Sequence, residues 1–150
     1  MRRAVETVNS YLRRINPTFR RLELPPGETS ADLVVNHRGV SVLVNVGVER
    51  DGVVSATLLA PMFKEPVRAR DRDLARLYRT LLLLGASTFM HSGSMHVGIV
   101  GEESKRVISL IWSKPAEFLG FEEYKYALDM ISERCGALIF ALSKDFSFLE

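Results

Sequence analysis

The densest group of side chains that could act in catalysis is the stretch His91-Ser92-Gly93-Ser94-Met95-His96. A serine nucleophile needs a histidine to accept its proton and a carboxylate to orient that histidine. No acidic residue lies close to this stretch, and the Gly-x-Ser-x-Gly motif of the α/β hydrolases does not occur. We therefore interpret the stretch as the entry to a strand with two surface histidines, and we predict that the chain is not an enzyme.

The sequence also contains no motif for binding a metal ion or a cofactor. The single cysteine, Cys135, and the three histidines, His37, His91 and His96, do not supply the clustered ligands of a zinc site. Glycines with the spacing of a phosphate-binding or dinucleotide-binding loop do not occur. Cys135 falls within a helical apolar stripe, which indicates a small buried hydrophobic residue and not a reactive thiol. We predict no metal and no cofactor.

Composition places the chain among folded domains. Its 150 residues are 47% hydrophobic and 25% charged, which predicts one globular domain. No apolar stretch has the length of a membrane span, and the N-terminus lacks the apolar core of a signal peptide, so we expect a cytoplasmic protein. The net charge of +2 is too small to imply a polyanionic partner. The first 21 residues nevertheless hold six arginines and one acidic residue, a pattern typical of a solvated helix face or of a site for nucleic acid or an acidic segment.

Hydrophobic periodicity predicts three helices and five strands. The helices are expected at 2–15, 71–84 and 122–142, and the strands at 32–37, 40–49, 53–60, 94–100 and 106–113. Short connections between the first three strands require antiparallel pairing. The order predicts an α+β fold, α-βββ-α-ββ-α, with one antiparallel sheet packed with helices. The connection 18–30 is long enough to contain a further short element.

One strand defines the two faces of this sheet. Every second residue from 40 to 48 is valine, which predicts a face packed against the helices. The members of that face are Val40, Val42, Val44, Val46 and Val48. The alternate positions are Ser41, Leu43, Asn45 and Gly47, and they are expected on an open face. Leu43 among polar neighbours favours a partner that covers it.

The order of elements resembles that of the type III secretion chaperone-like fold, which secretion chaperones share with YbjN-like proteins. The C-terminal half is similar in detail, with a leucine-rich helix end, a polar stretch with glycine, a hairpin and a long last helix. These features are Leu81-Leu82-Leu83-Leu84-Gly85-Ala86, residues 92–99, Ile108-Ser109-Leu110 and residues 124–142. The chain departs from the secretion chaperones in its basic character and in having Gly85 where an asparagine-containing segment is usual. The resemblance, which covers residues 5–142, implies a non-catalytic cytoplasmic homodimer that binds an extended segment of a partner protein on its sheet and first helix.

The predicted partner-binding surface joins the open sheet face to the first helix. Its members are Val8, Leu12, Arg13, Arg14, Leu43, Val53, Leu59, Val107 and Ile111. The two arginines are expected at the rim, where they hold acidic residues of the partner. Leu83 lies on the polar side of its helix, and this predicts a dimer interface made of Arg76, Arg79, Leu83 and Leu84.

Two other functions are compatible with the same residues. One is that of a YbjN-like protein with a regulatory or unassigned role. The other is weak nucleic-acid binding through the arginine-rich N-terminal helix, which predicts an affinity that falls steeply with salt.

Overall fold

The computed structural model describes residues 1–66, 68–88 and 95–150, with the backbone alone for 84–88. Its elements follow the predicted α+β order, with one additional short helix. They are α1 (Arg2–Ile15), β1 (Ser30–His37), β2 (Val40–Val48), β3 (Val54–Lys64), α2 (Asp71–Thr88), β4 (Met95–Val100), β5 (Val107–Pro115), the 3-10 helix η1 (Ala116–Phe118) and α3 (Phe121–Asp145).

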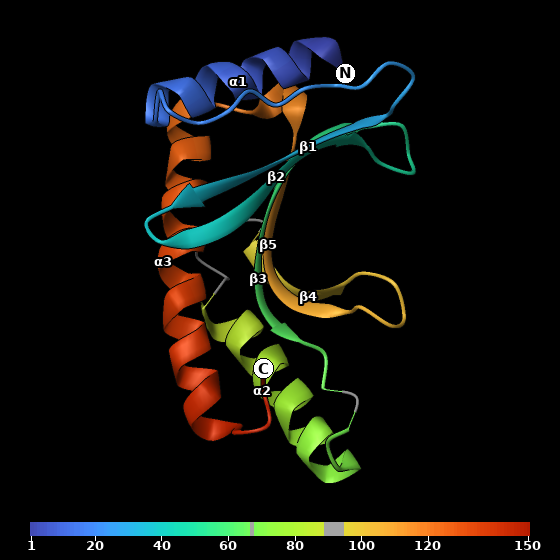
Figure 1. Ribbon diagram of the computed structural model, residues 1–150, viewed down its shortest axis with the longest axis vertical. Coiled ribbons are helices and arrows are strands. Elements are labelled where there is room, and N and C mark those ends of the chain that lie inside the picture. The colour runs from blue at the N-terminus through green and yellow to red at the C-terminus, as the bar shows by residue number, and fades with distance from the viewer. Residues whose placement is uncertain (67, 89–94) are drawn as a thin grey trace.

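The five strands form one antiparallel sheet in the order β1-β2-β3-β5-β4. Figure 1 shows α3 running along one face of this curved sheet, α1 across one end of α3, and α2 near its other end. The apolar stripe of α3 forms the centre of the core, as its spacing of three and four residues predicts. All its members are buried, namely Tyr124, Leu128, Ile131, Cys135, Leu138 and Leu142.

The faces of β2 are as predicted at its centre and differ at its ends. Val42, Val44 and Val46 are each 0% exposed and belong to the core. Val40 is only partly buried, and Val48 is 42% exposed. The expectation of five buried valines is therefore wrong, because only the three middle valines are fully buried, whereas Val40 packs at the edge of the core and Val48 is exposed at the end of the strand.

Two element ends and one connection also differ notably from the prediction. β3 continues through Pro61, where the sequence predicts its end, and its register with β5 is irregular between Pro61 and Phe63. Such an irregularity accommodates the missing proline amide hydrogen. α2 continues through Gly85 to Thr88. Residues 16–29, all of them described, form neither a helix nor a strand, so the expected additional element is not there.

Two kinds of feature are absent from the described residues. No helix in these ranges combines the length and the apolar character of a membrane span. Within the same ranges, no three His, Cys, Asp or Glu side chains are grouped so that they could hold a metal ion.

Candidate protein-binding surface

An apolar row crosses four strands on the sheet face opposite α1 and α3. Its members are Val34 in β1, Leu43 in β2, Leu59 in β3 and Ile111 in β5, and each is the direct cross-strand neighbour of the next. Val34 is 61% exposed, and the other three side chains are half-buried. Figure 1 shows no described helix over this face. We call these four residues the apolar row.

A polar row runs beside the apolar row on the same face. It consists of Asp32, Asn45, Thr57 and Ser113, which are also successive cross-strand neighbours. Asn45 Nδ2 donates a hydrogen bond to Asp32 Oδ1 over 2.7 Å, and the hydroxyls of Thr57 and Ser113 are 2.9 Å apart. An apolar strip with a polar border is the usual organisation of a protein-binding surface.

The absence of a side chain at Gly98 in β4 leaves room for the side chain of Ile111 in the apolar row. A Cβ atom added to Gly98 would lie only 2.8 Å from Cδ1 of Ile111. The isoleucine side chain therefore lies over the glycine backbone, a position that a side chain at 98 would obstruct. His96, the exposed cross-strand neighbour of Ile111, follows on the same face.

The structure brings together three of the predicted sheet residues and separates two others. Leu43, Leu59 and Ile111 are adjacent, whereas Val53 precedes β3 in the hairpin and Val107 lies at the far end of β5 opposite Lys64. Val34 is the member of the row that the sequence analysis did not identify. The sequence feature that predicts the position of Val34 is the two-residue turn Arg38-Gly39. This turn places His37 opposite Val40, and therefore Val34 opposite Leu43.

The predicted apolar contribution of α1 to this surface, that of Val8 and Leu12, is wrong. Val8 is 0% and Leu12 is 1% exposed, since both pack in the core beneath the sheet. α1 is further held to the start of α3 by Tyr11, whose hydroxyl donates a hydrogen bond to the carbonyl of Leu119 over 2.9 Å. These two apolar side chains are therefore unavailable to a partner of the folded chain.

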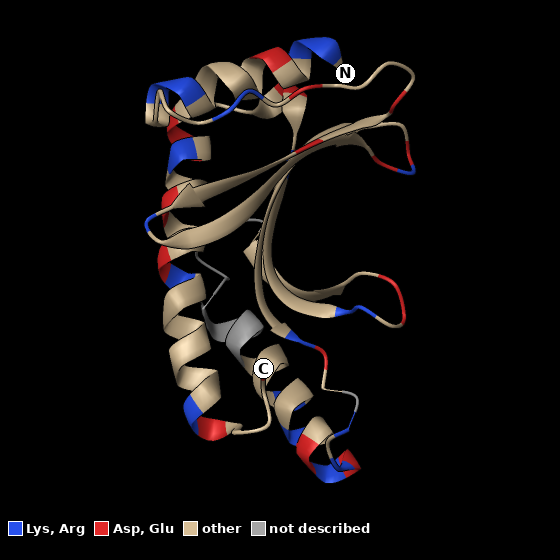
Figure 2. Cartoon of the chain, in the orientation of Figure 1, with Lys and Arg blue, Asp and Glu red and all other residues tan. Residues whose placement is uncertain are grey.

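A basic groove lies between α1 and the extended segment that follows it. The groove has a volume of about 430 Å³, and its walls include Asn9, Arg13 and Arg21. Figure 2 shows that both ends of α1 are basic and that the extended segment alongside it contains a basic stretch. Arg14, in contrast, is engaged within the chain, because its guanidinium carbon lies 3.5 Å from the centroid of the Phe121 ring.

The predicted dimer surface on α2 contains two adjacent exposed leucines. Leu82 is 75% and Leu83 is 60% exposed, whereas the side chain of Leu84 lies outside the described residues. Arg79 is exposed on the same helix, and the guanidinium carbon of Arg76 lies 5.3 Å from the centroid of the Phe146 ring. Leu82, which is not among the predicted interface residues, is thus part of the exposed surface.

The candidate nucleophiles lie partly outside the described structure. His91, Ser92 and Ser94 fall outside the described residues, and His96 is exposed on β4. Cys135 is 0% exposed, and burial raises the pKa of its thiol, so the protonated form persists at neutral pH. This agrees with its interpretation as a small core residue.

Comparisons with known proteins identify the fold. The sequence matches no protein-family model and is similar to no curated protein. The structure is similar to a chain of the HopA1–SchA chaperone–effector complex, with a TM-score of 0.55, 14% identity, and 91% of this chain and 93% of that chain covered. It is also similar to a chain of the heterodimeric ExoU–SpcU complex from the type III secretion system of Pseudomonas aeruginosa, with a TM-score of 0.55, 14% identity and coverages of 95% and 98%.

A further similar structure is YbjN from E. coli, for which a role as a transcription regulator is suggested. Its TM-score is 0.56, its identity is 11%, and the match covers 97% of this chain and 94% of YbjN. The chain therefore has the type III secretion chaperone-like fold that its sequence resembles, and at these identities the likeness concerns the fold.

Proposed function

Starting from this chaperone-like fold, we propose that the chain is a non-catalytic binding protein that holds an extended segment of a partner protein on the open face of its sheet. The observation that carries the proposal is the apolar row from Val34 to Ile111 on a face that no described helix covers. Two of the similar structures are a chaperone–effector complex and a heterodimeric complex of a secretion system, and this supports a role in protein binding.

The dimensions of the row suit an extended chain. Neighbouring strands are about 4.8 Å apart, so the four members span roughly 14 Å. Alternate side chains of an extended segment project to one side about 7 Å apart, so roughly three apolar side chains would cover the row. Fully burying an exposed leucine-sized side chain contributes about 1.5–3 kcal/mol, and the half-buried members of the row would gain part of that.

The proposal is tested with peptides selected from a random library by binding to the native protein. Their affinity is measured by fluorescence anisotropy for the native protein, for Leu43→Glu and for Val48→Glu. Val48 is the matched control, because it is an exposed valine of the same strand on the opposite phase. We expect Leu43→Glu to weaken binding by roughly tenfold or more, and Val48→Glu to leave it unchanged. Equal affinities for all three proteins would contradict the proposal.

We further propose that two copies associate through α2. Leu82 and Leu83 form an exposed apolar pair, and such a pair is stabilised when another surface covers it. Sedimentation equilibrium of the native protein should then show a dimer, and Leu83→Arg should shift it toward monomer. Phe140→Arg, a change of an exposed residue on α3, serves as the control and should leave the dimer intact. A monomeric native protein at micromolar concentration would refute this assembly.

The similarity to YbjN favours a second candidate function, a regulatory role. A third candidate is weak nucleic-acid binding through the arginine-rich N-terminal helix. The arginines of the first 21 residues would then contact phosphates. Binding to a DNA duplex should in that case fall steeply with salt concentration. DNA binding that is absent at low salt would exclude this candidate.

A further inference from the structure

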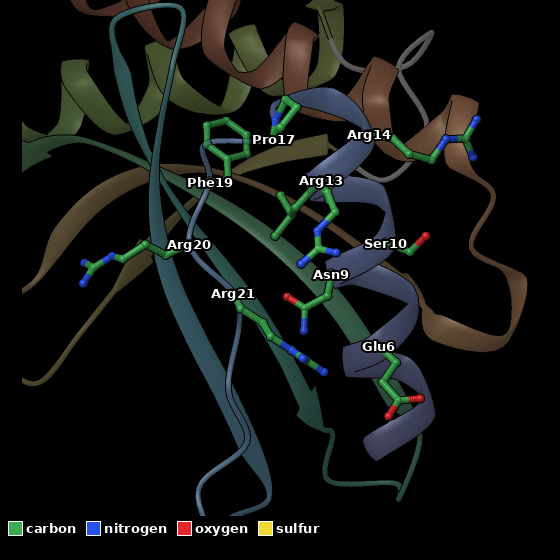
Figure 3. A pocket seen from close by; sticks show the side chains of 10 residues that line it. Glu6, Asn9, Ser10, Arg13, Arg14, Pro17, Phe19, Arg20 and Arg21 are labelled. Carbon is green, nitrogen blue, oxygen red and sulfur yellow. The ribbon is translucent and has the colours of Figure 1, made fainter.

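Two guanidinium groups converge in the basic groove without a carboxylate between them. Arg13 lies one helical turn after Asn9 on the same side of α1, and Arg21 precedes Leu22, whose backbone Asn9 holds. Figure 3 shows the side chains of Arg13 and Arg21 extending into the space on either side of Asn9, whereas Arg14 points away. Among the described residues, neither Arg13 nor Arg21 forms a salt bridge.

The backbone that carries these arginines is held firmly. The side-chain amide of Asn9 donates one hydrogen bond to Leu22 and accepts another from it, over 2.8 and 2.7 Å. Leu22 and Leu12 are each 1% exposed, so both walls of the groove are anchored in the core. A site whose walls are fixed before binding loses less conformational entropy when a ligand binds.

The charges around the groove favour separate carboxylates over a continuous polyanion. Glu6 lines the same groove, and Glu23 and Asp32 line a neighbouring depression. A phosphate backbone carries a charge on every nucleotide and would pass close to these acids, whose charge repels it. One or two carboxylates of a polypeptide could instead contact Arg13 and Arg21 and avoid them, and paired guanidinium groups suit carboxylates geometrically.

The groove is continuous with the apolar row through shared residues. Arg20 and Arg21 line both the groove and the neighbouring depression, and Val34 lines that depression as well. Val34 is at the same time the first member of the apolar row. A ligand can therefore pass from the arginines of α1 and its following segment, over the edge strand β1, onto the open face.

We propose that the partner segment is acidic at one end and carries apolar residues at alternate positions toward the other. Its carboxylates bind between Arg13 and Arg21, and its apolar side chains cover the row from Val34 to Ile111. This inference rests on the proposed function and adds the chemistry of the partner to it.

The test uses fluorescein-labelled peptides of about twelve residues, with aspartate and glutamate at one end and leucines at alternate positions toward the other. Both orders of the two halves are made. Matched peptides carry asparagine and glutamine in place of the acids, and a single-stranded DNA of similar length is the nucleic-acid probe. Affinities are measured for the native protein, for the double variant Arg13→Gln/Arg21→Gln and for Arg50→Gln/Arg72→Gln. The last is the control, because it removes the same charge at two exposed arginines elsewhere.

We expect the acidic peptide to bind the native protein and the double variant to weaken that binding roughly tenfold or more. The control variant should change it by less than about twofold. The amide-containing peptide should bind the native protein about as weakly as the acidic peptide binds the double variant.

The other outcomes separate this inference from the proposed function. If Leu43→Glu weakens the binding of library-selected peptides and the double arginine variant affects neither those peptides nor the acidic one, the acidic anchor is refuted and the function stands. If neither variant matters, both proposals fail. An acidic peptide that does not bind at millimolar concentration refutes the inference, as does a DNA strand that binds more tightly than the peptide and depends on Arg13 and Arg21.

Discussion

The side chain of Asn9 in α1 forms two hydrogen bonds with the backbone of Leu22, as a neighbouring strand would in a sheet. Its Nδ2 donates to the Leu22 carbonyl over 2.8 Å, and its Oδ1 accepts from the Leu22 amide over 2.7 Å. Residues 16–29 form neither helix nor strand, so these bonds satisfy a backbone that lacks a regular partner. One asparagine thus fastens the extended segment to the first helix.

Replacing Asn9 by alanine should loosen this segment. The change removes both hydrogen bonds and leaves the buried Leu22 backbone without them, which should lower the free energy of unfolding by about 1–3 kcal/mol. Urea denaturation measures that loss, and hydrogen exchange should show a less protected Leu22 amide. Ser10→Ala, at the exposed neighbouring position, is the control. An Asn9→Ala protein with native stability and native exchange at Leu22 would contradict the assigned contact.

The two faces of β2 should respond oppositely to a charge. Val44 is 0% exposed, so Val44→Asp places a carboxylate in the core at a cost of several kcal/mol and should unfold the domain. Ser41 is exposed on the other face, and Ser41→Asp should keep the native circular dichroism and melting temperature. If both variants fold equally well, the faces have been assigned wrongly.

Removing the hydroxyl of Tyr124 should not destabilise the protein. Tyr124 is 0% exposed, and its hydroxyl has no hydrogen-bond partner among the described residues. Its ring packs edge-on against Trp112, with the centroids 6.1 Å apart, and phenylalanine keeps that contact. Because an unpaired buried hydroxyl costs free energy, Tyr124→Phe should raise the free energy of unfolding by about 1 kcal/mol. A loss of stability of the same size would show that the hydroxyl has a partner.

Alkaline pH should destabilise the protein through two buried groups. Burial raises the pKa of Cys135 and of Tyr124 in the folded state, so the folded chain keeps protons that the unfolded chain releases. The stability that they contribute is complete below the unfolded pKa values of about 8.5 and 10, and it is lost as the pH rises above them. Denaturation between pH 7 and 11 should show this decline. Cys135→Ala should reduce the loss of stability at the lower end of this pH range, and Tyr124→Phe should reduce the loss at the upper end. Identical pH dependence for all three proteins would refute the assignment.

A side chain at position 98 should displace Ile111 from the apolar row. Because a Cβ there would lie 2.8 Å from Cδ1 of Ile111, Gly98→Ala should shift the δ1 methyl resonance of Ile111 in a methyl NMR spectrum. Gly136→Ala is the control, since nothing lies within 4 Å of its added Cβ. That control should leave the resonance in place and stabilise α3 by up to about 1 kcal/mol. An unchanged Ile111 resonance in Gly98→Ala would contradict the predicted displacement.

Local patterns in the sequence determined the order of the elements and the two faces of β2. The alternation of valines separates Val44 from Leu43, and spacings of three and four residues define the buried stripe of α3, because the periods of strand and helix are properties of the local backbone. The turn Arg38-Gly39 also sets the register in which Val34 pairs with Leu43. Such patterns fail at Pro61, where they predict the end of β3. The strand continues past this proline because it pairs with β5.

The tertiary structure alone decided which residues from distant segments come together in the candidate site. Ile111 joins the row beside Leu59 because β3 pairs with β5 instead of β4. This pairing joins segments about 50 residues apart, and no local pattern encodes it. In the same way, Val8 and Leu12 lie in the core because α1 packs beneath the sheet, and Arg21 meets Arg13 because Asn9 holds Leu22. Local periodicity tells which side of an element is apolar, whereas the burial of that side depends on contacts between segments far apart in the chain.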